Sequence, residues 1–464
     1  MRRALMTMNR LAILCVVLAG CAAQPKYERP PVDLPQAWKE SAPRFAADGR
    51  WWRIYADPTL DKLVEEALAQ NADVSLAIAR VDEARALLGV AQSRLGPVVD
   101  ATFDRSRSLS STATGLLPPS IPRERNDYRA SLNVSFELDL WGRLSSAAGA
   151  ARAELLASEA ARDTVRLALA SQVARSYFAL GALDARVELT RRTVGLRDDA
   201  LKLQRRRSET GLISDFELRQ LEAEAAAVRT QLPPLERDRD TEEAALAVLL
   251  GRSPRAIFEG AVSRAPAGME LLGTALPDGM PSELLLRRPD LVEAEQRLVA
   301  ANARIAAARA AMFPSIVLTG FLGSESAALA GLFSGPAGIW SLAAALTQPI
   351  FAAGRLEAET EAAQARERQA IAQYQRAIQI AFREVRDALT TQTRARESFE
   401  AESQRVKALS DTLRLARLRY EHGLASQLDV LDSERGLLAA EMARIEALRA
   451  QRASIADLYK ALGG

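Results

Sequence analysis

The sequence is poor in the side chains on which most enzyme chemistry depends. Its 464 residues include two cysteines, Cys15 and Cys21, and a single histidine, His422. General acid–base and nucleophilic catalysis draw on such groups in specific arrangements, and the sequence has no nucleophile elbow, no glycine-rich phosphate loop and no Cys/His ligand spacing. It therefore predicts a protein that is not an enzyme, has no metal site and no bound cofactor, and keeps His422 as a surface residue.

An excess of charge of one sign is also lacking. Lys and Arg number 61, Asp and Glu number 59, and the formal net charge is +2. The two signs are interleaved along the chain, so no basic stripe suited to a phosphate backbone is present. We expect no nucleic-acid partner.

The first twenty residues have the features of a secretion signal. Arginines precede an apolar run at 11–18, which is too short to span a bilayer. The run ends in Leu18-Ala19-Gly20-Cys21, which resembles the lipobox of bacterial lipoproteins. This predicts a signal peptide at 1–20, a lipidated Cys21, and sorting to the outer membrane, because the two following residues are not acidic. The alternative is an ordinary secretory signal that ends near a cysteine.

Two stretches of the chain recur 212 residues apart. Gly142-Arg143-Leu144 matches Gly354-Arg355-Leu356, and Gly211-Leu212-Ile213-Ser214 matches Gly423-Leu424-Ala425-Ser426. Internal repeats decide the architecture, so the sequence predicts a duplicated half-structure. The expected regions are an extended N-terminal segment at 21–58, a first repeat at 59–250, a connecting segment at 251–281 and a second repeat at 282–464.

Each repeat contains a helical hairpin of unusual length. Residues 355–422 contain no proline and no glycine, and a helix of this length would extend roughly 100 Å. Positions spaced by three and four residues predict a coiled-coil seam on both limbs: Val406, Leu409, Leu413, Ala416 and Tyr420, then Leu428, Leu431, Arg435, Leu438, Met442 and Ile445. Arg435 is unusual, because an apolar residue is expected at its position.

The segments ahead of each hairpin alternate with a period of two. Apolar and polar residues alternate strictly from Tyr128 to Leu140, and shorter alternating runs lie at 99–104, 316–322 and 340–347. Transmembrane strands need about 9–11 residues, whereas ordinary strands have about 5–6. We therefore expect two membrane strands in each repeat, each pair preceded by an Ala-rich helix, at about 60–95 and from Pro289.

Four strands cannot close a barrel, since about eight are the minimum, and open sheet edges are not tolerated in lipid. The sequence therefore predicts an α+β membrane protein whose chain shares a transmembrane β-barrel with copies of itself. The helices are expected to form a long antiparallel coiled-coil barrel. Two or three copies are both compatible with these patterns.

Several motifs resemble those of the TolC-like outer-membrane efflux proteins, in particular the lipoprotein branch of the NodT or OprM type. They lie at 285–291, which includes Arg288-Pro289-Asp290, and at 300–305, 313–315, 348–351 and 428–435. The resemblance spans the whole mature chain. It implies a homotrimer with one twelve-stranded barrel in the outer membrane and a periplasmic helical tunnel. It also implies two partners, a periplasmic adaptor and an inner-membrane transporter of the resistance-nodulation-division (RND) type, for which the protein is the passive exit channel.

The resemblance further implies a gate at the periplasmic tip, at Leu428, Asp432 and Arg435. Asp432 lies one helical turn from Arg435, so this acid, or one from a neighbouring chain, could pair with the cation. The alternative is that Arg435 extends its charge into water.

The hairpin turns have a second expected role. Gly211 and Gly423 permit a sharp reversal, and we expect Gly211, Leu212, Gly423 and Leu424 to dock the adaptor. The two tips are not equivalent, because the first has Phe216, Arg219 and Ala223 where the second has Leu428, Leu431 and Arg435.

Other functions fit parts of the sequence. A channel for type I protein secretion shares the fold, but the lipobox and Arg288-Pro289-Asp290 weigh against it. A periplasmic adaptor lipoprotein would carry one hairpin instead of two, and a coiled-coil scaffold would lack the alternation at 128–140. Drugs, metals and aromatic acids all stay open as substrates.

Overall fold

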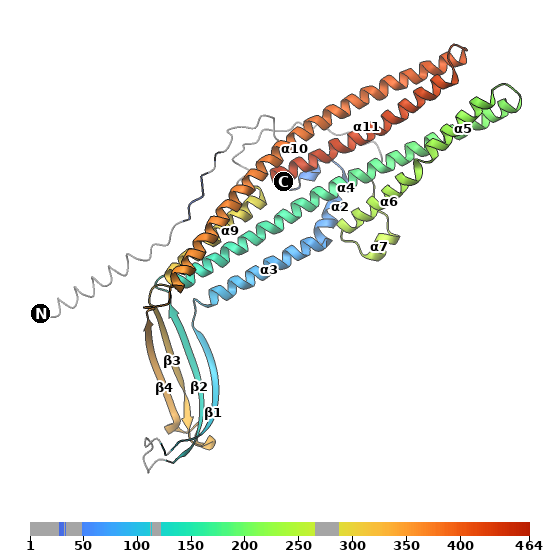
Figure 1. Cartoon of the computed structure of the whole chain (residues 1–464). Helices are drawn as coiled ribbons and strands as arrows, with labels where there is room; N and C mark the ends of the chain where they lie inside the picture. The colour runs from blue at the N-terminus through green and yellow to red at the C-terminus, as the bar shows by residue number, and fades with distance from the viewer. Residues whose placement is uncertain (1–26, 32, 34–48, 112, 114–121, 265–286) are drawn as a thin grey trace. The chain divides into compact units, whose positions relative to one another are not determined.

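The computed structural model describes residues 27–31, 33, 49–111, 113, 122–264 and 287–464 (Figure 1). The expected signal peptide, Cys21 and most of the connecting segment at 251–281 lie outside the described residues. In chain order the helices and strands are η1 (Trp51–Tyr55), α2 (Pro58–Gln70), α3 (Ala72–Ser93), β1 (Val98–Leu109), β2 (Glu124–Leu138), α4 (Arg143–Glu209), α5 (Asp215–Arg229), α6 (Leu232–Leu249), α7 (Pro254–Glu259), α9 (Pro289–Ala310), β3 (Ser315–Ser326), η3 (Leu329–Gly331), η4 (Gly335–Ala337), β4 (Gly338–Thr347), α10 (Arg355–Glu421) and α11 (Gln427–Leu462).

The chain packs into two compact units, each built from three separate stretches. The unit that contains the strands, here the sheet unit, comprises Met1–Pro31, Arg80–Glu159 and Glu293–Gln375. The other, here the hairpin unit, comprises Val32–Ala79, Ala160–Val292 and Arg376–Gly464. Each unit therefore draws on both halves of the sequence.

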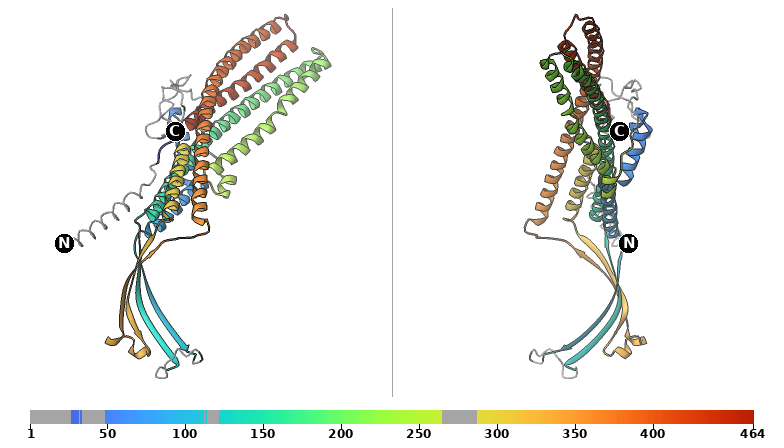
Figure 2. Two further views of the ribbon diagram at one scale, coloured as in Figure 1. Left: turned by 60° about the vertical axis from the view of Figure 1, so that its left-hand side comes forward. Right: turned by 90° about the vertical axis from the view of Figure 1, so that its right-hand side faces the viewer.

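The sheet unit contains four antiparallel strands in the order β1-β2-β3-β4, which form one continuous sheet (Figure 2). Ala101 lies opposite Leu132, Leu132 opposite Leu322, and Leu322 opposite Trp340, so these side chains share one face. The large exposed apolar residues of that face are Val99, Phe103, Leu109, Leu132, Val134, Leu318, Leu322, Trp340, Leu342 and Leu346. The predicted period of two is confirmed, and it gives the sheet one apolar surface.

The opposite face of the sheet is polar. Asp104 lies opposite Arg129, and Arg129 opposite Glu325. The Arg129 guanidinium is 3.9 Å from the Glu325 carboxylate and 4.4 Å from the centre of the Phe321 ring. The apolar face also carries charge where β1 meets the start of β2, because Arg105, Arg107 and Glu124 lie on that side.

The strand bounds differ from those expected. β1 continues to Leu109, beyond the predicted end at 104, and pairs there with the start of β2. β2 ends at Leu138 instead of Leu140, because the next residue, Asp139, caps α4. Its carboxylate accepts hydrogen bonds from the backbone N–H groups of Leu144 (2.9 Å) and Ser145 (2.8 Å).

The two long helices confirm the duplication. α4 and α10 have 67 residues each, and each follows a glycine with positive φ, Gly142 (73°) and Gly354 (79°). Across the residues that the structure describes, every helix is too polar or too short to cross a bilayer as a hydrophobic segment.

The helix expected at about 60–95 is two helices. Asn71 separates α2 from α3 with an extended backbone (ψ 136°). Its side-chain oxygen accepts from the backbone N–H of Asp73 (2.8 Å), and its amide nitrogen donates to the carbonyl of Leu249 (3.0 Å). Asparagine competes well for backbone groups in this way, so a tertiary hydrogen bond ends the helix where the Ala-rich pattern continues.

The return limb of the first hairpin is also divided, into α5 and α6, whereas α11 runs unbroken for 36 residues. α6 begins with Pro233 and Pro234 in its first turn, where a missing N–H has no helical partner to lose. Pro233 and Pro234 also explain why α5 and α6 are not one continuous helix, because each proline removes a backbone hydrogen bond that a helix interior requires.

The core of the hairpin unit is built on aromatic residues. Trp51 and Trp52 are both buried. Trp51 stacks on Tyr459 near the end of α11, with ring centres 5.7 Å apart. The Tyr177 hydroxyl donates to Asp57 (2.7 Å), which also caps α2. The segment at 51–57 and the end of α11 therefore meet in one core.

Candidate functional site at the hairpin tips

Both hairpins turn with the same backbone geometry. Gly211 and Gly423 have φ of 72° and 70°, and the N–H of the next leucine donates back to the helix, Leu212 to Arg207 (2.8 Å) and Leu424 to Arg419 (2.7 Å). This is the glycine-dependent helix end known as the Schellman motif. It leaves the side chains of Leu212 and Leu424 exposed.

The limb after each turn starts with a capping box, in which two side chains satisfy the free N–H groups of the first turn. Ser214 pairs with Glu217, and Ser426 pairs with Asp429. The Ser426 N–H and hydroxyl both donate to Asp429 (2.7 and 2.8 Å). These hydrogen bonds lower the pKa of Asp429.

Each hairpin is also closed by an ion pair at matching positions. Arg205 lies 3.0 Å from Glu222 in the first hairpin, and Arg417 lies 2.8 Å from Glu434 in the second. Hydrogen bonds from Arg205, and then from Arg219, lower the pKa of Glu222. The 212-residue repeat therefore extends to side-chain contacts.

The two hairpins pack on each other near the tips. Leu431 of α11 is 2% exposed and packs with Leu201 of α4 and with Leu221 and Ala225 of α5. The predicted seam position of Leu431 is correct, but its partners come from the other hairpin. Arg219, its counterpart in the first repeat, faces solvent and pairs with Glu222.

The predicted gate residue Arg435 has a different environment from the one expected. Its side chain is 49% exposed instead of buried in a seam, and its guanidinium reaches Glu224 of α5. There it forms two contacts with Glu224, from Nε to Oε2 (3.2 Å) and from Nη2 to Oε1 (3.1 Å). Asp432, the predicted partner, lies at 3.5 Å.

Leu428 and Asp432 have exposed side chains in the single chain. Glu224 was not among the residues predicted from the sequence. Glu224 follows Ala223, which is the counterpart of Arg435 in the repeat. A carboxylate next to this position was the feature of the sequence that could have indicated the pair.

A second ion pair between the hairpins was also missed. Arg197 of α4 lies 2.6 Å from Glu434, and its side chain is 9% exposed. Glu434 therefore bridges Arg197 and Arg417. The sequence contained an indication of this pair, because the cation Arg197 occupies the position where the second repeat has the predicted seam residue Leu409.

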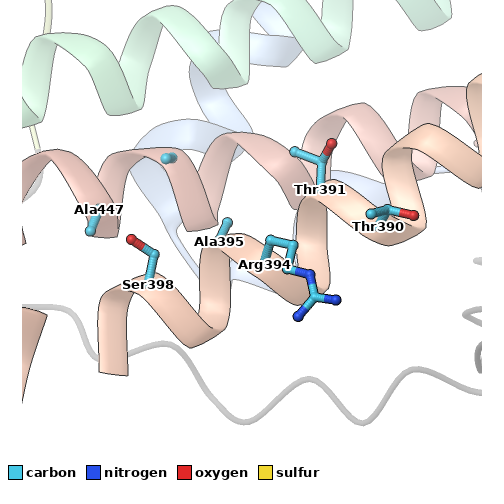
Figure 3. A pocket seen from close by; sticks show the side chains of 7 residues that line it. Thr390, Thr391, Arg394, Ala395, Ser398 and Ala447 are labelled. Atoms are coloured by element: carbon cyan, nitrogen blue, oxygen red, sulfur yellow. The ribbon is translucent and has the colours of Figure 1, made fainter. Parts of the chain in front are cut away.

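Other candidate sites carry little chemistry. His422 is exposed beside the second turn, and no group of three metal-ligating side chains occurs among the described residues. A groove of about 390 Å³ between α10 and α11 is lined by Thr390, Thr391, Arg394, Ala395, Ser398, Ala447 and Ala450 (Figure 3). Its lining holds no carboxylate, imidazole or thiol for acid–base or nucleophilic work.

Comparison with known proteins gives a consistent result. A family model described as "Outer membrane efflux protein" matches residues 63–252 and 280–464. The probable efflux pump outer membrane protein TtgC of Pseudomonas putida is 35% identical over 98% of this chain and 94% of its own length. The cation efflux system protein CusC of Escherichia coli K12 is 34% identical over 98% of this chain and 99% of its own.

The solved structures agree. The open state of the MtrE outer membrane channel of Neisseria gonorrhoeae superposes with a TM-score of 0.84 at 33% identity, covering 96% of this chain and 98% of that one. The predicted fold class, the outer-membrane location and the function as outer-membrane channel component of an RND-type efflux pump are confirmed. The chain belongs to the outer membrane efflux protein family.

Proposed function

We propose that the chain is one of three identical protomers of a passive exit channel that works with a periplasmic adaptor and an inner-membrane RND transporter, and that it has no catalytic role. One observation carries the proposal. The sheet exposes an apolar face, while β1 and β4 each pair on one side only. In lipid, unpaired strand edges leave backbone groups unsatisfied. Three copies would pair every edge and give twelve strands, enough for a barrel with an open interior.

Native mass spectrometry of the detergent-extracted protein, followed by conductance recording in planar bilayers, tests this proposal. We expect a trimer with a discrete single-channel conductance. A folded monomer, or a dimer that conducts, would contradict the stoichiometry.

The proposed gate consists of Leu428, Asp432 and Arg435, with Glu224 as the partner of Arg435. The exposed side chains of Leu428 and Asp432 are available to a neighbouring protomer, whereas the Arg435–Glu224 pair joins α11 to α5 within one protomer. Separation of the hairpins would break that pair, as in a two-state rigid-body opening.

Alanine at Asp432, Arg435 or Glu224 should raise basal conductance. Exposed ion pairs contribute about 0.2–1 kcal/mol, so the increase should reach up to about fivefold. Glu402→Ala is the control, because Glu402 pairs with Arg405 on its own helix. Unchanged conductance in all three variants would remove the gate assignment.

The turns are the proposed docking sites for the adaptor. Gly211 and Gly423 set the reversal, and exposed Leu212 and Leu424 offer apolar side chains at the two tips. A photo-crosslinking residue at Leu212 or Leu424 should capture the adaptor in cells, while the same residue at exposed Arg386 should not. Equal capture at all three positions would argue against docking at the tips.

A covalent lipid on Cys21 is the remaining part of the proposal. The lipobox pattern at 18–21 supports it. The mass of the N-terminal peptide of the membrane-extracted protein tests it directly, since acylation adds several hundred daltons and Cys21→Ser abolishes that addition.

A further inference from the structure

We propose that residues 27–31, here called the strap, form a latch on α9 that keeps the tether of the lipid anchor short and so fixes the depth of the sheet in the bilayer. The latch is an interaction between the strap and Glu295. The effect on depth rests on the proposed lipidation of Cys21, whereas the latch itself does not.

The strap and α9 are joined by a two-point ion pair. Arg29 donates from Nε to Oε1 and from Nη2 to Oε2 of Glu295, both at 2.7 Å. The Tyr27 hydroxyl donates to the same Oε1 at 3.2 Å. Forked arginine–carboxylate pairs of this kind are stronger and more directional than single contacts.

Without the strap, Glu295 would lose its hydrogen-bond and ion-pair partners among the described residues. Its side chain is 11% exposed, and its hydrogen-bond and ion-pair partners among the described residues are Tyr27 and Arg29. A buried carboxylate is costly unless it is paired. The strap therefore pairs a carboxylate that is mostly buried in the folded chain.

A second tyrosine completes this environment. Tyr374 of α10 is fully buried, and its hydroxyl has no hydrogen-bond partner within the described residues. Burial and the Glu295 carboxylate raise the pKa of both Tyr27 and Tyr374. Both hydroxyls therefore keep their protons beside the carboxylate, and Arg29 supplies the positive charge.

The position of the latch matches the distance to the membrane. Tyr27 lies six positions after Cys21, so the tether reaches at most about 20 Å. Glu295 precedes Ala310, the last residue of α9, by 15 residues, or about 22 Å of helix. β3 and its apolar face begin just after that end. These two lengths are similar, so a latched tether that follows α9 would bring the acyl chains to about the level at which the strands begin.

Without the latch, the tether would be much longer. The next buried side chain that the structure describes is Trp51, thirty residues after Cys21. The mean span of a flexible chain grows with the square root of its length. Release of the latch should therefore roughly double the range that a residue near Cys21 explores.

Pulsed electron–electron distance measurement tests the latch. The mature chain has Cys21 as its one cysteine, and its sulfur is blocked by the lipid or replaced in Cys21→Ser, so labels can be placed at Gln24→Cys and at exposed Arg309→Cys. We expect a narrow distance distribution in the unaltered strap and one about three times as wide in Arg29→Ala and Glu295→Gln. Glu154→Gln, which removes a carboxylate that pairs with Arg304 of α9, should leave the distribution narrow.

A charge exchange between the two residues distinguishes a specific latch from a general structural role. The exchange Arg29→Glu with Glu295→Arg should restore the narrow distribution. A wide distribution with the native strap, or an unchanged one in both Arg29→Ala and Glu295→Gln, would overturn the latch. Arg29 lies in the strap, outside the packed core. Arg29→Ala therefore still tests the latch even if Glu295→Gln folds poorly.

Depth is measured separately with a fluorophore at Leu140→Cys, quenched by headgroup-labelled lipid. Latch variants should shift the quenching of the lipidated protein, and Cys21→Ser should abolish the difference. If the distance distributions broaden but the quenching does not change, the latch is supported and its proposed effect on depth is wrong. Mass analysis of the N-terminus shows independently whether the lipid is present.

Discussion

Arg197 and Glu434 form an ion pair between the two hairpins, with Nη1 and Oε2 2.6 Å apart and the arginine side chain 9% exposed. Leu431 precedes Glu434 by three residues on α11, so apolar packing and charge pairing both hold α4 against α11 near the hairpin tips. Any opening that separates the hairpins must expose Leu431 and separate this pair.

Loss of the Arg197 cation should weaken the hairpin contact more than loss of an exposed cation on the same helix. Arg197→Met leaves Glu434 with Arg417, so we expect a loss of about 1–3 kcal/mol, together with raised basal conductance. Arg191→Met is the control, because Arg191 pairs with Glu236 at the surface and should cost below about 1 kcal/mol. Hydrogen exchange near the tips measures both, and equal effects would contradict the assigned role.

The two faces of β4 should respond in opposite ways to an added charge. Leu342 lies on the apolar face, and its neighbour Ser341 lies on the polar face. Leu342→Arg should destabilise the sheet in the membrane by about 2–4 kcal/mol and reduce the amount assembled in the outer membrane, while Ser341→Arg should assemble normally. Comparable assembly of both variants would contradict the orientation of the sheet.

The second tip should lose order in acid. Hydrogen bonds from Ser426 lower the pKa of Asp429 below its ordinary 3.8. A lowered folded-state pKa gives stability that is present above the unfolded value and is lost as the pH falls through the folded value. Hydrogen exchange of the first turn of α11 should therefore accelerate below about pH 4. Ser426→Ala should remove this pH dependence, and Ser214→Ala in the first tip should not.

Two glycines of the first hairpin should respond in opposite directions to alanine. Gly195 lies inside α4 with open space around an added Cβ, whereas Gly211 has a φ of +72°. Gly195→Ala should stabilise by about 0.5–1 kcal/mol, and Gly211→Ala should cost about 1–2 kcal/mol because alanine is strained in that region. Thermal unfolding of the detergent-extracted protein compares them, and a Gly211→Ala variant as stable as the parent would show that the turn can change its backbone.

Local patterns determined a large part of this protein. The period of two gave the strands and their apolar face, the absence of proline and glycine gave α10, and the repeated Gly-Leu turn gave both tips. Each of these features depends on residues within a few positions of one another, so its physical cause is contained in a short window of sequence.

Contacts between distant residues were decided by the tertiary structure. Asn71 ends a helix because Leu249 offers a carbonyl, Arg435 turns to Glu224 although Asp432 is nearer in sequence, and Arg29 finds Glu295 in the other half of the chain. Sequence periodicity fixes which face of a helix is apolar, but it does not fix which other helix covers that face. The partners of a buried charge depend on that packing, because a carboxylate pairs with whichever cation the folded chain brings within a few ångströms.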